Sequence, residues 1–329
     1  MSAAFSEFIK IIGKGKKGSR SLTREEAGTA MKMVLNQQVT GEQRGAFLML
    51  LRTREETPEE ICGFLDACRE VEHQAIAALP ATIDIGCYAG KRRQLPWYLL
   101  AVACLAKAGM PVFLHGAHEP GSGRLYASQV LPELGLTAVG NVAQAASQLE
   151  NQGATYLDLS LVLPALNDII KLREVFGLRS CANTLGRLLN PSAAPYSVQG
   201  VFHTHLDDKH GRVNEQFEHY DALCFRGDGG DPEVNSERET TLFITRAGAT
   251  AEVTLPATKH GWAMKDKALA ISDMLAYWRG ELAHKYADNS VLPTLTSYLM
   301  LIRQLDYTAA AAQARELWSQ RDKTQLPFT

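Results

Sequence analysis

Residues 82–114 read TIDIGCYAGKRRQLPWYLLAVACLAKAGMPVFL and combine two short apolar or β-branched runs with one long apolar run. Thr82–Ile85 and Pro111–Leu114 have the length and composition of buried strands, whereas Trp97–Ala108 has the length of a helix. Strands that alternate with helices of about 10–15 residues are typical of a mainly parallel sheet with crossover helices. The segment therefore predicts an α/β fold.

The same alternation continues towards the C-terminus. Thr241–Arg246 and Glu252–Leu255, joined by Ala247–Thr250, predict a β-hairpin added to the sheet. Residues 265–329 return to helical patterns. The remaining expected elements are strands at Thr155–Leu159, Ser197–Phe202 and Ala222–Phe225, and helices at Ser122–Leu134, Ala143–Glu150 and Asn167–Phe176.

Residues 1–72 predict consecutive helices. Thr40-x-x-Gln43 and Thr57-Pro58-x-Glu60 are capping boxes, in which a hydroxyl and a downstream acid or amide satisfy free N–H groups of the first helical turn. We expect residues 1–75 to form a small all-helical domain, completed by helices from about 165–192, and residues 80–329 to form a large α/β domain. Because this short helical segment has more apolar surface than it can bury within its own domain, we expect it to pack on a partner chain as well.

The composition excludes two broad classes of protein. A formal charge of -2 excludes a globally basic nucleic-acid-binding protein, so any polyanion site must come from local clusters of charge. No stretch approaches the roughly 18 apolar residues of a membrane span, and the N-terminus lacks a signal-peptide pattern. The 6 cysteines form no C-x-x-C pair, which is typical of buried thiols in a reducing compartment. We expect a cytoplasmic protein without a membrane partner.

Cations gather at two places in the chain. Residues 1–24 contain six Lys or Arg side chains against one acid, Glu7. The loop after Ile85 lies where an α/β protein can cradle phosphate, but Cys87 and Tyr88 crowd it, and three consecutive cations follow its glycines. Both clusters fit a polyanion site, and the first fits an ordinary solvated face equally well. The candidate cations are Lys14, Lys16, Lys17 and Arg20 in the first cluster, and Lys91, Arg92 and Arg93 in the second.

Residues 177–191, GLRSCANTLGRLLNP, resemble the G-x-R-[ST]-x-x-N-x-L-G-x-L-x-N-P segment of the anthranilate phosphoribosyltransferase family. Thr57–Arg69 is similar to the E-T-P-E-E helix of that family. The resemblance spans nearly the whole chain. It implies a small helical domain joined to a large α/β domain, and a homodimer formed through the helical domains.

The catalytic motifs of the family match poorly. Its G-T-G-G-D loop, which wraps the diphosphate of phosphoribosyl pyrophosphate, corresponds to Gly86–Gly90, and the aspartate is absent. Its N-x-S-T motif falls on Pro96–Leu99, where apolar side chains and a missing proline N–H cannot bind phosphate. Its K-H-G-N-R motif becomes Leu114–His118, which keeps only His115 and Gly116. The resemblance therefore implies a vestigial site made of Gly86, Gly90, His115, Gly116, Arg179 and Asn183.

Arg179 and an acidic pair retain partial matches. Arg179 corresponds to an arginine that contacts the anthranilate carboxylate in active members, although an internal salt bridge is the favoured interpretation. Asn183 matches for packing reasons as readily as for functional ones. The family's pair of magnesium ligands resembles Asp231 and Glu233, but an intervening proline disturbs the tight octahedral placement that magnesium needs. We therefore expect no metal site, and Asp231 and Glu233 are only weak candidates for one.

Three other patterns are weak. His203-x-His205-x-Asp207-Asp208-x-His210 contains metal-binding residue types, but its loop does not impose one coordination shell. The glycine cluster Gly227–Asp231 is typical of a turn after a strand. Trp97 and Tyr98 are more typical of a helix core than of base stacking.

Two functions of different classes remain. The first is binding of DNA or RNA without strong sequence preference through the basic clusters of a dimer, because the chain resembles the YbiB-like branch, which lacks the substrate motifs and binds nucleic acid. It requires no cofactor. The alternative is an active phosphoribosyltransferase that uses phosphoribosyl pyrophosphate and magnesium with anthranilate or another aromatic acceptor. Loss of several phosphate-binding groups argues against it, since electrostatic stabilisation is usually the largest catalytic contribution.

Overall fold

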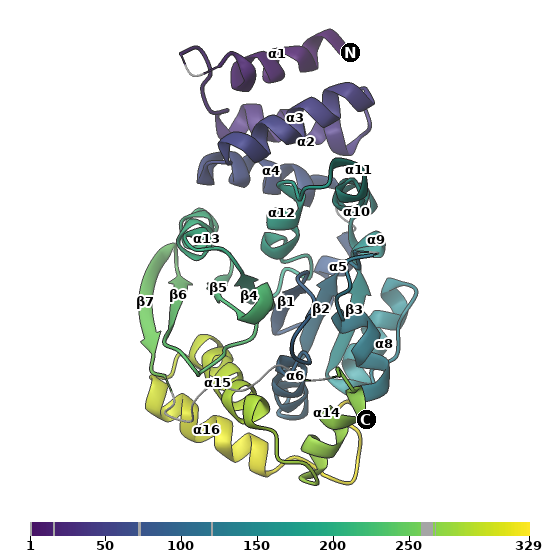
Figure 1. Cartoon of the computed structure of the whole chain (residues 1–329), viewed down its shortest axis with the longest axis vertical. Helices are drawn as coiled ribbons and strands as arrows, with labels where there is room; N and C mark the ends of the chain where they lie inside the picture. The colour runs from purple at the N-terminus through teal and green to yellow at the C-terminus, as the bar shows by residue number, and fades with distance from the viewer. Residues whose placement is uncertain (1, 16, 72–73, 120, 258–265, 267) are drawn as a thin grey trace.

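The computed structural model describes residues 2–15, 17–71, 74–119, 121–257, 266 and 268–329. A small helical domain lies at one end of a larger α/β domain (Figure 1). The predicted α/β fold with a small helical N-terminal domain is confirmed.

Four N-terminal helices build the helical domain, and both predicted capping boxes are present. Thr40 caps one helix together with Gln43, and the Thr57 hydroxyl accepts a hydrogen bond from the Glu60 N–H while Glu60 accepts one from the Thr57 N–H. Helices from the middle of the chain lie against this domain (Figure 1). The N-terminal helices are α1 (Ser2–Gly13), α2 (Arg24–Leu35), α3 (Gly41–Arg54) and α4 (Pro58–Val71), and the added ones are α10 (Pro164–Lys171), α11 (Arg173–Phe176) and α12 (Ala182–Leu188).

A seven-stranded sheet forms the centre of the α/β domain, in the order β3-β2-β1-β4-β5-β6-β7. The first five strands are parallel, and the last two are antiparallel. Strands β1, β2 and β4 are almost wholly buried, as a parallel sheet with both faces covered requires. The strands are β1 (Ile83–Cys87), β2 (Val112–Gly116), β3 (Ala154–Asp158), β4 (Tyr196–Val201), β5 (Asp221–Arg226), β6 (Thr240–Arg246) and β7 (Ala249–Leu255).

Two apolar cores cover the two faces of this sheet. One contains α6 (Tyr98–Lys107), which is buried over nearly its whole length, and α15 (Lys285–Ile302), which packs on it. The other joins the helical domain to the opposite face, where Phe113 and Leu157 lie. The cysteines are free and buried, as expected. The other elements are α5 (Gln74–Ala77), α7 (Ala127–Val130), η1 (Leu131–Leu134), α8 (Val142–Gln152), α9 (Leu159–Val162), α13 (Leu206–Asn214), η2 (Asp228–Gly230), α14 (Ile271–Arg279) and α16 (Tyr307–Ser319).

Three predicted segments differ from the structure, and the first is the helix expected at Asn167–Phe176, where α10 ends at Lys171 and α11 begins at Arg173. The hairpin turns at Ala247 and Gly248 alone, because both adopt positive φ angles and allow β7 to begin at Ala249. The helix expected at Ser122–Leu134 is only α7 followed by a 3₁₀ turn, since residues 121–126 form the polar loop that crosses the β1–α6 loop. In the part of the chain that the structure describes, no helix has both the length and the apolar character that crossing a bilayer requires.

Gly63 allows α2 and α4 to cross closely. A Cβ atom at Gly63 would lie 2.1 Å from the carbonyl oxygen of Arg24 and 2.9 Å from the Cβ of Ala27. We therefore expect Gly63→Ala to lower the free energy of unfolding by about 1–3 kcal/mol, measured by urea denaturation. In the control Gly45→Ala, the new Cβ would lie 3.8 Å from the Phe176 ring, and we expect a gain of about 0.5–1 kcal/mol from helix propensity. Equal effects of the two substitutions would contradict the close crossing.

Candidate functional site

The site lies between β1 and β4, where the order in which the chain adds strands to the sheet reverses. From β1 the chain proceeds to β2 and β3 on one side, whereas β4 leads to β5 on the other. In open α/β sheets, ligands bind outside the carboxyl ends of the strands at this switch point. Tyr88 follows β1 there, and Phe202 follows β4.

Tyr88 fills the space directly after β1. Its side chain is buried, and its hydroxyl lies 2.8 Å from Nδ1 of His115. Its ring lies so close to Gly186 that a Cβ atom there would be 2.9 Å from the nearest ring carbon. A Cβ at Gly86 would likewise lie 3.2 Å from the Cα of Arg187. Protein atoms therefore occupy the room that a phosphate-binding glycine loop leaves open, and the expected crowding of the loop is confirmed.

Lys91 points into the protein. Its ammonium nitrogen lies 2.6 Å from Oε1 of Glu233 and 3.3 Å from Oδ2 of Asp228, and only 1% of the side chain is exposed. Burial opposes the charge of the ammonium, but the nearby carboxylates outweigh it and raise the pKa of Lys91. A paired backbone bridge to Leu125 holds the residue in place. The expectation that Lys91 contacts phosphate from the surface is wrong, because its charge already has an internal partner.

The acidic pair Asp231 and Glu233 is also occupied by protein groups. Asp231 accepts hydrogen bonds from the N–H groups of Ala89 and Gly90, at 3.2 and 3.3 Å. Besides Lys91, Glu233 accepts hydrogen bonds at 2.8 Å from the Tyr98 N–H and from the Tyr286 hydroxyl. Burial raises the pKa of both carboxyl groups. As placed, the pair does not fit a magnesium site, and the described residues hold no group of three His, Cys, Asp or Glu side chains arranged around one metal position.

His115 and Gly116 belong to the interior of the sheet. Nε2 of His115 lies 2.9 Å from Oδ1 of Asp84, whose other oxygen accepts a 2.7 Å hydrogen bond from the Ser192 hydroxyl. A Cβ at Gly116 would lie 2.3 Å from the carbonyl oxygen of Cys87. Both residues therefore have structural reasons for their presence, independent of any ligand.

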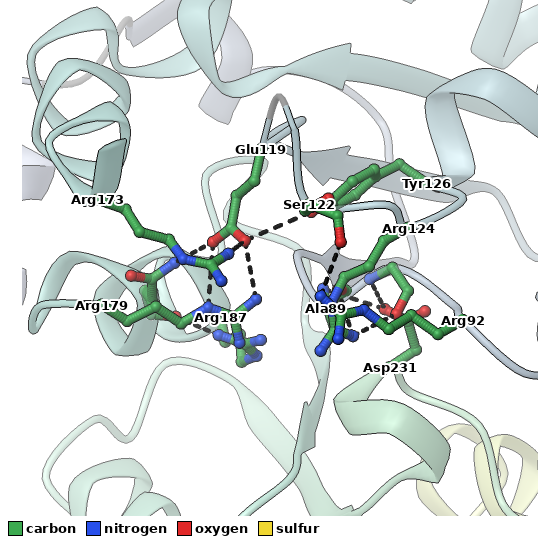
Figure 2. Close-up of polar contacts among 12 residues, drawn as sticks. Ala89, Arg92, Glu119, Ser122, Arg124, Tyr126, Arg173, Arg179, Arg187 and Asp231 are labelled. Carbon is green, nitrogen blue, oxygen red and sulfur yellow. Dashed lines mark hydrogen bonds and ion pairs between the residues drawn. The ribbon is translucent and has the colours of Figure 1, made fainter. Parts of the chain in front are cut away.

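Glu119 neutralises the retained arginine (Figure 2). Arg179 donates two hydrogen bonds to its carboxylate, at 3.1 and 3.0 Å, and Asn183 donates a third at 3.2 Å. Arg173 forms a further ion pair with the same carboxylate. Burial opposes ionisation of Glu119, but Arg179 and Arg173 outweigh it and hold its pKa below the usual value. The internal salt bridge favoured for Arg179 is thus present.

Glu119 and Arg187 were missed from the sequence. Arg187 is 9% exposed, and its donors meet the carbonyl oxygens of Gly200, at 2.9 Å, and of Asn183. Burial and the adjacent charge of Arg179 lower the pKa of Arg187 to about 10. The usable signals were a single acid in the glycine-bounded loop after β2 and an arginine at a variable position of the 177–191 segment.

The remaining predicted cations differ in whether a carboxylate of the chain already pairs with them. Arg20 forms two hydrogen bonds with Glu26, at 2.6 and 2.7 Å, so its charge is already paired. Arg92 and Arg93 are exposed, and Arg92 donates a 2.7 Å hydrogen bond to the Ser122 carbonyl. Lys14 and Lys17 are exposed as well, whereas Lys16 lies outside the described residues. The exposed cations therefore lie on both domains, with Lys14 and Lys17 on the helical domain and Arg92 and Arg93 in the loop between β1 and α6.

Comparison with known proteins identifies two matching family models. Residues 6–71 match the glycosyl transferase family helical bundle domain, and residues 99–317 match the glycosyl transferase family a/b domain. An anthranilate phosphoribosyltransferase of Methylobacterium nodulans is 31% identical over 248 residues, which are 74% of this chain and 72% of the relative. The uncharacterized protein YbiB of Escherichia coli (strain K12) is 28% identical over 238 residues, which are 71% of this chain and 74% of that protein.

A solved structure has the same fold. Anthranilate phosphoribosyltransferase (TrpD) from Thermus thermophilus superposes with a TM-score of 0.78 at 21% sequence identity. The match covers 98% of this chain and 97% of the other.

The buried position of Lys91 leads to a stability prediction. Lys91→Met would leave Glu233 and Asp228 without their ammonium partner, and breaking a buried pair in this way costs about 3–5 kcal/mol. We expect a loss of that size in the free energy of unfolding, measured by urea denaturation. Arg92→Met, on the exposed neighbour, should change it by less than about 0.5 kcal/mol. Wild-type stability of the Lys91→Met variant would contradict the internal role of Lys91.

Proposed function

Since the chain belongs to the glycosyl transferase family that includes the anthranilate phosphoribosyltransferases, we propose that it uses this scaffold to bind the phosphate backbone of nucleic acid and does not transfer phosphoribosyl groups. The observation that carries the proposal is the buried contact between Lys91 and Glu233. It ties up a cation that directly follows the loop matching the family's diphosphate-binding motif, together with a carboxylate of the pair that resembles the family's magnesium ligands.

The exposed cations support backbone binding. Lys14, Lys17, Arg92 and Arg93 are solvent-exposed, and none has a carboxylate within ion-pair distance in the described structure. Free surface cations bind polyanions by releasing condensed counterions, which needs no enclosed pocket. The basic clusters therefore favour an extended polyanion over a small diphosphate.

We also propose that a second copy of this chain packs on the helical domain. Val175 is 79% exposed and Leu178 is 50% exposed, and Phe176 between them lies near Gly45 of α3. Apolar side chains exposed on one face mark interaction surfaces. In a two-fold dimer each basic cluster would occur twice on one assembly.

Phosphoribosyl transfer is the second candidate, and the names of the relatives favour it over nucleic-acid binding. Arg179 also remains at the position that matches the anthranilate-binding arginine. Against it, Glu119 already occupies that guanidinium, and Tyr88 fills the space after β1. The two candidates require different experiments.

The first experiment measures binding to unrelated DNA and RNA oligonucleotides over a range of salt concentrations. We expect the logarithm of the binding constant to fall linearly with the logarithm of the salt concentration, by roughly 0.9 per duplex phosphate contact. Replacing Lys14, Lys17, Arg92 and Arg93 together by glutamate should weaken binding of every sequence alike and flatten this slope. The matched control replaces four other exposed cations, Lys171, Arg279, Arg303 and Lys323. Equal losses in both variants would show that only net charge matters and would overturn the assigned surface.

The second experiment measures turnover with phosphoribosyl pyrophosphate, magnesium and anthranilate. We expect none above background, because the diphosphate would meet Tyr88 and a neutralised Lys91. Turnover on the order of 1 per second, an ordinary enzyme rate, would refute this expectation and establish the second candidate.

A further inference from the structure

A small cavity lies between the two domains, beside the space after β4. It has a volume of about 90 Å³, and none of the described residues that line it is acidic. Pockets that enclose a drug-sized ligand have roughly 300–1,000 Å³, so this cavity suits a small group. The lining residues that matter are Arg52, Arg179, Asn183, Arg187 and Phe202.

Of the three arginines that line the cavity, only Arg179 has a carboxylate within ion-pair distance among the described residues. Arg179 shares the carboxylate of Glu119 with Arg173. Neither Arg52 nor Arg187 has a carboxylate within ion-pair distance among the described residues, although Arg187 is nine-tenths buried. Burial and the charge of Arg179 both lower the pKa of Arg187. The carboxylates of Glu119 and Asp231 act on Arg187 only from beyond ion-pair distance, so an anion in direct contact with its guanidinium would be favoured.

Phe202 adds an aromatic surface at the same place. Its side chain is 57% exposed although it is large and apolar. Its ring lies edge-on to the His203 ring, with 5.2 Å between the two ring centroids. An exposed ring beside a cluster of arginines is the arrangement on which nucleic-acid bases stack while their phosphates are bound. The cavity and this ring therefore provide the two halves of one recognition site.

We propose that the cavity binds the phosphate group of a nucleotide while the base stacks on Phe202. Guanidinium groups bind phosphate oxygens in a bidentate manner, which suits Arg52, while Arg179 and Arg187 keep their internal partners and add positive charge around the anion. The volume admits the phosphate and leaves the nucleoside outside, next to the exposed ring. If the bound nucleotide is the terminal one of a DNA or RNA strand, this inference rests on the proposed nucleic-acid binding. The site itself also accepts a free nucleotide.

The test uses adenosine 5′-monophosphate, with adenosine and inorganic phosphate as comparison ligands, and calorimetric titration of the full chain. We expect the monophosphate to bind at least tenfold more tightly than either comparison ligand. Arg52→Glu should weaken its binding at least tenfold, whereas Arg44→Glu, the same charge change on α3 outside the cavity, should leave it unchanged. Phe202→Ala should remove most of the advantage over inorganic phosphate. Arg52 and Phe202 are exposed and Arg44 is half-buried, so the three variants should fold.

Three results would overturn the inference: wild-type affinity of Arg52→Glu, equal losses in Arg52→Glu and Arg44→Glu, or inorganic phosphate binding as tightly as the monophosphate. Oligonucleotides with and without a 5′-phosphate separate it from the proposed function. A preference for the 5′-phosphate that Arg52→Glu abolishes supports both. Oligonucleotide binding without any binding of the monophosphate refutes only the cavity. Monophosphate binding without oligonucleotide binding refutes only the proposed function.

Discussion

The rest of the site depends on the buried ammonium of Lys91. It joins the loop after β1 to the segment after β5, because Glu233 and Asp228 both lie within ion-pair distance of it. The same Glu233 accepts the N–H of Tyr98 at the start of α6 and the hydroxyl of Tyr286 on α15. One carboxylate thus fixes the loop, its following helix and the C-terminal helices together. If this loop opened to wrap a diphosphate, Lys91 would move away and leave the carboxylates of Glu233 and Asp228 without their ammonium partner, which is costly for a buried pair.

Glu119 repeats the same arrangement on the other side of the site. Its carboxylate binds two arginines and an asparagine, so these donors already have a partner within the chain. In both places, the protein supplies the counter-charge from its own chain. Arg179 therefore keeps the position of the matching arginine of the family, but its partner is a carboxylate of the same chain.

Most of the fold follows from patterns in the sequence, whereas the partners of the charged side chains do not. Alternating strands and helices located the parallel strands, because the hydrophobic period depends only on local residues. The capping boxes of Thr40 and Thr57 were equally local. The pairing of Lys91 with Glu233 joins residues 142 positions apart, and that of Arg179 with Glu119 joins residues 60 positions apart. Three consecutive cations look alike in a sequence, and only the bridge to Leu125 turns the first one inward while the next two remain exposed.

The same reasoning explains why the arginines without a close carboxylate lie at the junction of the domains. Acids reach Lys91 and Arg179 from loops at the ends of β5 and β2, so the carboxylates lie within the α/β domain. Arg52 comes from α3 and Arg187 from α12, and neither has a carboxylate within ion-pair distance among the described residues, although the charge of Glu119 acts on Arg187. Arg187 instead uses the carbonyl oxygens of Gly200 and Asn183, which orient a guanidinium but do not cancel its charge. Tyr88 thus fills the space after β1 while the charges around it are paired internally, and the neighbouring cavity is lined by two arginines that have no carboxylate within ion-pair distance among the described residues.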